Sequence, residues 1–164
     1  VRTRVDPANA AVVSPDAGRI KVAEQWGNRL GGVPLAFVHK TRDLTRPNQA
    51  TANRVVGDVA GRTAIIVDDL IDTAGTICGA VRVVLEAGAK DVIVAATHGV
   101  LSDPATKRLQ ESGLRELVIT DTLPIGPEKR FPGMTVLSIA PVLARAIDEV
   151  FEDGSVTSLF AGAY

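Results

Sequence analysis

Two adjacent aspartates follow one of the most apolar stretches of the chain. Asp68 and Asp69 come directly after residues 63–67, whose nearly unbroken apolar character predicts a strand buried on both faces, as in a parallel sheet. Ligands of parallel α/β sheets bind at the carboxyl ends of the strands. Carboxylates in that position accept hydrogen bonds from sugar hydroxyls or hold a hydrated Mg²⁺. Both aspartates are therefore candidate binding residues.

A run of small and hydroxyl-bearing residues begins four positions after Asp68 and leads into a predicted helix. It consists of Asp72, Thr73, Ala74, Gly75 and Thr76. Gly75 gives the backbone freedom for a tight turn, and the free N–H groups at a helix N-terminus attract an anion. The threonines add hydroxyl donors, so the run predicts a cradle for one phosphate group. An ordinary capped helix start is the alternative, whereas a Walker loop is excluded because its Gly-Lys-Ser/Thr ending is missing.

Three further segments place polar residues near predicted strand ends. Asp16 follows a predicted strand at residues 10–13, at the same end of the sheet as the acid pair. There it would serve a metal or diphosphate site, or cap the helix that begins near Arg19. Residues 40–52 are polar, carry several charges and lack periodicity, so they predict a long loop of the kind that is often functional. Residues 121–133 hold three prolines and two glycines and predict a second long loop.

Short apolar runs alternate with amphipathic segments along the whole chain. Strands are predicted at residues 10–13, 35–38, 63–67, 91–97, 117–120 and 135–138. Helices are predicted at residues 19–30, 76–87, 103–111 and 139–150, the last with the clearest apolar stripe. This alternation predicts an α/β fold with a mostly parallel central sheet flanked by helices. Residues 1–164 are expected to form a single domain.

The composition narrows the function classes. Hydrophobic residues make up 46% and charged residues 23%, which is ordinary for a globular domain. The single cysteine, Cys78, excludes an internal disulfide and a thiolate metal cluster. A net charge of −1 and a pI near 6.1 argue against a nucleic-acid partner. No apolar run reaches membrane-spanning length and the start is polar, so a cytoplasmic protein without a membrane partner is expected.

Residues 65–76 resemble a known motif. They look like the phosphoribosyl-diphosphate-binding signature of type I phosphoribosyltransferases and ribose-phosphate diphosphokinases. The resemblance implies a phosphoribosyltransferase-like fold in which Asp68 and Asp69 contact the ribose hydroxyls. It also implies that the run from Asp72 to Thr76 wraps the 5-phosphate. The motif alone does not separate a transferase from a diphosphokinase.

Two other segments favour the diphosphokinases. Residues 12–19 resemble a strand and loop of that family whose aspartate, here Asp16, serves a Mg²⁺–diphosphate site. Residues 37–42 resemble the start of its flexible catalytic loop, and Lys40 and Arg42 match the Lys-x-Arg pair. The likeness extends from about residue 12 to residue 160.

This resemblance implies a specific reaction. The diphosphoryl group of ATP moves to the anomeric hydroxyl of ribose 5-phosphate, and AMP leaves. Lys40 and Arg42 would be catalytic, with Arg42 also binding substrate, and Mg²⁺ would be the cofactor. The family is built from two related domains and forms homo-oligomers, often hexamers. The chain resembles the carboxyl-terminal domain, so an amino-terminal domain would complete the ATP site.

Two alternatives stay open. A phosphoribosyltransferase would join the sugar to a nitrogenous base, and it would need a hood over the base for which no obvious insertion exists. A non-catalytic regulatory paralogue would keep the fold. It is expected to lose the phosphate cradle or the Lys-Arg pair, and both are intact in this sequence.

Overall fold

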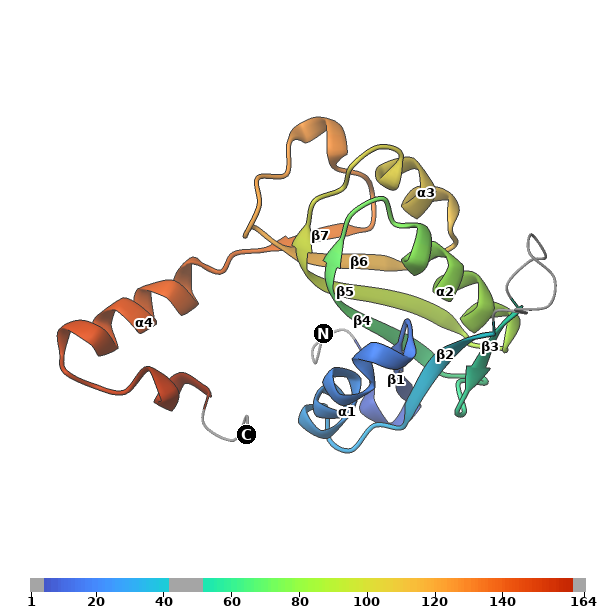
Figure 1. The fold of residues 1–164 in the computed structure, drawn as a ribbon, viewed down its shortest axis with the longest axis horizontal. Helices are drawn as coiled ribbons and strands as arrows, with labels where there is room; N and C mark the ends of the chain where they lie inside the picture. The colour runs from blue at the N-terminus through green and yellow to red at the C-terminus, as the bar shows by residue number, and fades with distance from the viewer. Residues whose placement is uncertain (1–4, 42–51, 161–164) are drawn as a thin grey trace.

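The computed structural model describes residues 5–41 and 52–160, which form a seven-stranded sheet with helices on both faces (Figure 1). The strands are β1 (Ala10–Ser14), β2 (Leu35–Thr41), β3 (Ala52–Val56), β4 (Thr63–Ile71), β5 (Asp91–Gly99), β6 (Glu116–Thr120) and β7 (Met134–Leu137). Their order in the sheet is β3-β2-β1-β4-β5-β6-β7, and only the β2–β3 pair is antiparallel. The predicted α/β class with a mostly parallel sheet is confirmed.

The described residues also form four α-helices and four short 3₁₀ helices. They are α1 (Ile20–Arg29), α2 (Gly75–Glu86), α3 (Ala105–Glu111), α4 (Ala140–Phe151), η1 (Pro7–Asn9), η2 (Ala17–Arg19), η3 (Pro127–Lys129) and η4 (Val156–Phe160). Of these, η1 precedes β1, and α4 and η4 follow β7. All four predicted α-helices are present, with ends that differ from the predicted ones by a few residues. Among the residues described, no helix is both long and apolar enough to cross a membrane.

The two faces of the sheet have separate apolar cores. Alternate residues of β4 point to opposite faces, so that Ile66 packs beneath α2 and α3 while Ile65 packs on the side of α1. The larger core includes Ala64, Ile66, Val81, Val84, Val94, Leu109 and Leu117. The smaller one includes Val12, Ala23, Ile65, Val67 and Ile93. Strands buried from both sides explain the continuous apolar runs in the sequence.

Strand β3 was not predicted, because residues 40–52 were interpreted as a loop. Residues 40–41 instead end β2 and residue 52 begins β3, which pairs with β2 at the edge of the sheet. Val55 packs against the core, but Arg54 and Val56 are exposed. An edge strand needs few apolar residues, and this one therefore lacks the run that identified the other strands.

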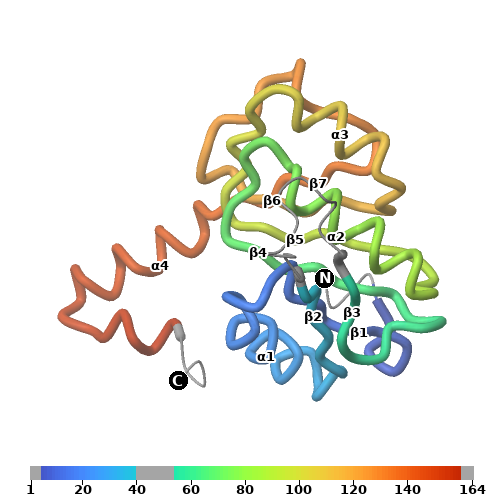
Figure 2. The backbone as a smooth tube through the Cα atoms, turned by 45° about the vertical axis from the view of Figure 1, so that its right-hand side comes forward, coloured from blue at the N-terminus to red at the C-terminus, as the bar shows by residue number. Residues whose placement is uncertain are grey.

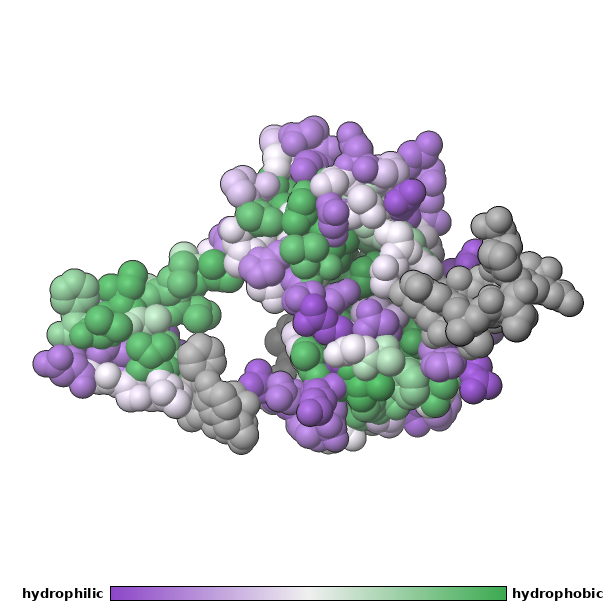
Figure 3. Space-filling model, in the orientation of Figure 1, coloured by the Kyte–Doolittle hydropathy of each residue, from purple (hydrophilic) through white to green (hydrophobic). Residues whose placement is uncertain are grey.

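Helix α4 carries its apolar stripe outside the core. The stripe was predicted from residues 139–150, yet Val142, Leu143, Ile147 and Val150 are each more than half exposed. The helix extends away from the sheet (Figure 2), and its apolar side chains are visible in the space-filling view (Figure 3). The helix itself was predicted correctly, but its apolar face meets no part of the described sheet.

Candidate functional site

The acid pair lies in the second half of β4 rather than beyond its end. Backbone pairing with β5 continues through Asp68 to Ile71, although the buried side chains stop at Val67 and resume only at Ile71. The strand was predicted to end at Val67 because the apolar run ends there. Backbone hydrogen bonds extend it, since a β-ladder does not depend on the polarity of the side chains.

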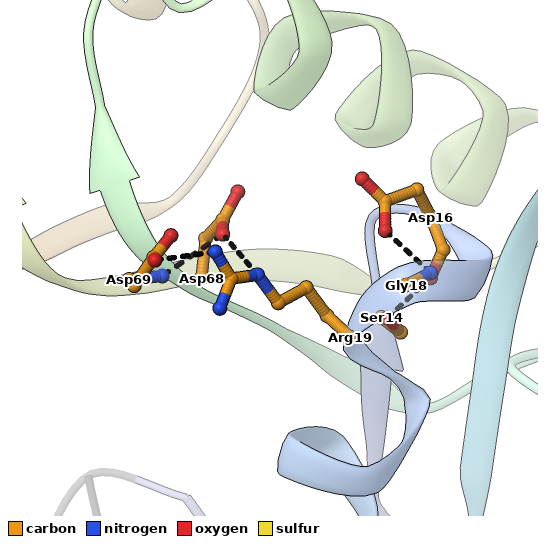
Figure 4. A network of polar contacts seen from close by, with 6 residues as sticks. All are labelled: Ser14, Asp16, Gly18, Arg19, Asp68 and Asp69. Carbon is orange, nitrogen blue, oxygen red and sulfur yellow. Dashed lines mark hydrogen bonds and ion pairs between the residues drawn. The ribbon is translucent and has the colours of Figure 1, made fainter.

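Arg19, the last residue of η2, binds both aspartates of the pair (Figure 4). Its guanidinium forms a hydrogen-bonded ion pair with Asp69, and its Nε lies 3.7 Å from Oδ1 of Asp68. The same Asp68 oxygen accepts a hydrogen bond of 2.9 Å from the backbone N–H of Asp69. From the sequence, Arg19 was interpreted only as the start of a helix. Residues 12–19 resemble a segment of the diphosphokinases, and the position of Arg19 at the end of this segment could have indicated that it belongs to the site.

The two aspartates have different acidities. Burial raises the pKa of Asp68, and this effect outweighs the backbone hydrogen bond from Asp69, which acts in the opposite direction. Asp69 is more exposed. Desolvation alone would raise the pKa of Asp69, but the hydrogen bond with Asp68 and the contacts with the Arg19 guanidinium outweigh it and lower this pKa. As the pH falls, Asp68 is therefore protonated before Asp69.

The predicted phosphate cradle forms the turn from β4 to α2. Ala74 adopts a left-handed conformation with φ of 60° and is buried, whereas Asp72, Thr73, Gly75 and Thr76 are exposed. Within the described part of the chain, no side chain caps the N-terminus of α2. The first N–H groups of a helix lack intrahelical partners, so these donors are available to an external anion.

One detail of the turn differs from the prediction. Gly75 was predicted to adopt the unusual backbone conformation, but it begins α2, and the left-handed residue is Ala74. A glycine is the usual sequence signal for a positive φ, which is why the preceding alanine was overlooked. The Cys78 N–H donates a 2.9 Å hydrogen bond to the Ala74 carbonyl, which is the first backbone hydrogen bond of α2 and ties Ala74 to the helix.

A cavity of about 300 Å³ brings most of the predicted site residues together. It is lined by Asp16, Arg19 and residues 68–77, and therefore by the acid pair and the whole cradle. A second cavity of about 590 Å³ begins at the same acid pair and extends over the uncovered sheet face next to Trp26. Its lining is mainly aliphatic and aromatic, so the smaller cavity is the one suited to a phosphorylated sugar.

Asp16 has the capping role that was one of the two considered for it. One oxygen, Oδ1, accepts a 2.8 Å hydrogen bond from the Gly18 N–H and so caps η2. Its backbone carbonyl accepts a 2.6 Å hydrogen bond from the Ser14 hydroxyl, which fixes the turn (Figure 4). The carboxylate also lines the cavity, so it remains available to a cation there. Within residues 5–41 and 52–160, no cluster of three metal-binding side chains exists.

The candidate catalytic pair is only partly described. The backbone of Lys40 pairs with that of Asn53 across β2 and β3, at the edge of the sheet. The Lys40 side chain and Arg42 lie outside the described part of the chain. The Nδ1 of His98 lies 2.9 Å from the hydroxyl of Thr122, and His98 is not one of the residues that line the smaller cavity.

Comparison with known protein families identifies the family of this chain. Residues 43–161 match the model of the phosphoribosyl synthetase-associated domain. The chain belongs to this family. The resemblance drawn from residues 65–76 is thereby confirmed.

Individual proteins agree with this assignment. A ribose-phosphate pyrophosphokinase from Bifidobacterium longum is 72% identical over 152 residues, which cover 93% of this chain and 45% of that protein. A crystal structure of phosphoribosylpyrophosphate synthetase from Mycobacterium smegmatis superposes with a TM-score of 0.81 at 62% identity, covering 89% of this chain and 46% of that one. An APRTase from Giardia lamblia shares the fold at 16% identity, with a TM-score of 0.50 and coverage of 68% and 67%. This chain spans about half the length of the curated relatives it matches.

Proposed function

We propose that this chain carries the ribose 5-phosphate site and the catalytic loop of a ribose-phosphate diphosphokinase. The enzyme transfers the diphosphoryl group of ATP to the anomeric hydroxyl of ribose 5-phosphate, giving phosphoribosyl diphosphate and AMP. The observation that carries the proposal is the 300 Å³ cavity, in which Asp68 and Asp69 face the same space as the cradle of residues 72–76. The names of the relatives support the same reaction.

The cavity offers a separate recognition element for each end of the sugar phosphate. The free N–H groups of the cradle and the hydroxyls of Thr73 and Thr76 bind the 5-phosphate. Asp68 and Asp69 accept hydrogen bonds from the ribose hydroxyls, and Arg19 orients both carboxylates. Fixing both ends holds the anomeric hydroxyl in one place, and such positioning is a main source of rate in phosphoryl transfer.

Lys40 and Arg42 neutralise charge in this proposal. Negative charge develops on the phosphoryl oxygens during transfer, and fixed cations stabilise it. Lysine supplies a compact charge, and arginine a planar fork that matches phosphate oxygens. Arg42 also binds substrate in this way. Lys40 lies on β2, which pairs with the edge strand β3, and Arg42 comes directly after β2 in the sequence.

Mg²⁺ fits the donor set of the cavity. Magnesium in proteins is usually held by one or two carboxylates, together with waters and substrate phosphates, rather than by a complete protein cage. Asp16 supplies such a carboxylate beside the cradle, which agrees with the lack of a three-residue cluster in the described chain. When bound, the ion neutralises the charge of the transferred diphosphate.

The proposal includes the setting of the enzyme. The relatives are about twice as long as this chain. An amino-terminal domain in the additional length would complete the ATP site. The assembly would be a cytoplasmic homo-oligomer. Size-exclusion chromatography with light scattering of the whole protein measures its oligomeric state.

Calorimetric titration of this chain with ribose 5-phosphate tests the proposal, with plain ribose as the control ligand. We expect saturable binding that requires the phosphate. Asp68→Asn should weaken it about tenfold, the scale of one hydrogen bond to a charged group. Asp148→Asn on α4 is the matched control and should change nothing. Unaltered affinity in Asp68→Asn would remove this residue from the sugar site, and diphosphate release that depends on an added base would favour a phosphoribosyltransferase.

A further inference from the structure

Arg108 reaches the phosphate cradle from a different element. It lies on α3, 35 residues beyond Thr73, and its Nη1 donates a 3.0 Å hydrogen bond to the Thr73 carbonyl. Helices α2 and α3 lie side by side over the same face of the sheet (Figure 1). Among the described residues, no ion pair joins this guanidinium to a carboxylate. The Thr73 carbonyl is the hydrogen-bond partner of Arg108 in the described chain.

The position of Arg108 relative to the cavity decides what this contact does. Thr73 and Ala74 line the smaller cavity, but Arg108 does not. The guanidinium thus contacts the turn from its outer side. The Thr73–Ala74 peptide is trans, and in a planar trans peptide the carbonyl and the following N–H point in opposite directions. A Thr73 carbonyl held by Arg108 therefore directs the Ala74 N–H away from Arg108 and toward the cavity.

The conformation of Ala74 explains why such a contact is needed. A non-glycine residue seldom adopts a φ of 60°, and it keeps this conformation only where neighbouring contacts impose it. Two contacts bracket this residue: Arg108 fixes the peptide before it, and the Cys78 N–H binds the carbonyl after it. Both act on the peptides whose N–H groups form the cradle.

We propose that Arg108 is a positioning residue for the phosphate cradle, acting through the Thr73 carbonyl to hold the Ala74 N–H toward the cavity. The identity of the ligand in this inference rests on the proposed function. The effect of Arg108 on the turn does not, because it is a property of the chain without ligand. The two parts can therefore be tested separately.

Three variants separate the contact from a general loss of charge. Arg108→Met removes the donor, and Arg108→Lys keeps a donor and the charge. Lys107→Met is the matched control, because it removes a charge from the adjacent exposed position of α3. Thermal unfolding should be similar for all three, since each replaces an exposed side chain.

Amide hydrogen exchange of Cys78 gives the readout without ligand, because its N–H is bound to the Ala74 carbonyl. We expect exchange about tenfold faster in Arg108→Met, with no change in Lys107→Met and none at Val84 in the middle of α2. Calorimetry should show affinity for ribose 5-phosphate about tenfold lower in Arg108→Met, largely restored in Arg108→Lys.

Each outcome has a definite meaning. Exchange at Cys78 equal in Arg108→Met and Lys107→Met overturns the proposal, whatever the affinities are. Lower affinity with unchanged exchange also overturns it, since Arg108 would then act on the ligand by charge alone. Faster exchange in Arg108→Met, in a chain that binds no ribose 5-phosphate, supports the positioning role and counts against the proposed function instead.

Discussion

At the scale of single residues, the site contains two adjacent aspartates whose pKa values are shifted in opposite directions. Asp68 and Asp69 are adjacent in sequence, yet burial raises the pKa of Asp68 while the contacts with Asp68 and Arg19 lower that of Asp69. Two carboxylates with separated acidities respond differently to pH. The difference arises from the deeper burial of Asp68 and from the contacts that Asp69 makes with Asp68 and Arg19.

The raised pKa of Asp68 predicts a pH dependence of sugar binding. The ionised carboxylate is the better acceptor for hydroxyl groups, so binding is complete above the raised pKa and weakens as the pH falls through it. The decline should begin at a higher pH than the ordinary aspartate value of 3.8 would give. Calorimetric affinities for ribose 5-phosphate between about pH 7 and about pH 4 measure it.

Methyl phosphate is the control ligand for this series, because it is a phosphate monoester like ribose 5-phosphate, with a second pKa of about 6, but has no sugar hydroxyls. Its affinity should lack the component due to Asp68. Asp68→Asn should remove that component from the ribose 5-phosphate profile. An identical profile in this variant would assign the pH dependence to another group.

At the scale of elements, the turn between β4 and α2 sets the geometry of the site. Ala74→Val should destabilise the chain by about 2 kcal/mol or more, because a β-branched residue is strained at positive φ. Ala74→Gly should change stability by less than about 1 kcal/mol, since relief of backbone strain offsets the added chain entropy.

Urea unfolding followed by circular dichroism measures both variants of Ala74. Ala87→Val, in the capping residue that follows α2 at a φ of −77°, is the matched control for the valine substitution. If Ala74→Val were no more destabilising than this control, the left-handed turn would not constrain the fold.

The sequence could predict elements wherever burial dictates the residue types. The runs in β1, β4 and β5 lie between two layers of helices, so their apolar character identified them directly. Strand β3 was not predicted, because an exposed edge strand does not require an apolar run. Strand β4 was predicted too short, because its backbone pairing with β5 continues beyond its run of buried side chains.

The candidate site was predictable where its residues are close in sequence. The acid pair and the cradle share twelve consecutive residues, and Asp16 belongs to a motif of its own. Arg19 and Arg108 act across 50 and 35 positions, respectively. No local spacing could show these contacts, because they arise from the packing of η2 and α3 beside the end of β4.

At the scale of the whole molecule, some isoleucines are buried in the core and others are exposed to solvent. Ile93 is fully buried between strands, whereas Ile147 on α4 is 56% exposed. Ile93→Ala should therefore cost about 2–5 kcal/mol, through lost burial and a cavity. Ile147→Ser should cost less than about 0.5 kcal/mol.

Denaturant unfolding of the two isoleucine variants tests this contrast at several protein concentrations. A large loss for Ile147→Ser at every concentration would mean that α4 packs within the same chain. A loss that grows with protein concentration would mean that another copy covers the helix.

The smaller cavity has a consequence for ionic strength. Four aspartates and one arginine line it, so three negative charges are uncompensated among its described residues. A phosphate entering the cradle meets local attraction from the N–H groups but repulsion from this surplus. Added salt screens the repulsion more effectively than it weakens the short hydrogen bonds. Affinity for ribose 5-phosphate should therefore rise by about twofold or more between about 0.05 and about 0.5 M sodium chloride, the reverse of an ordinary basic phosphate site. A steady fall with salt in calorimetry would show instead that cations outside the described residues dominate the field.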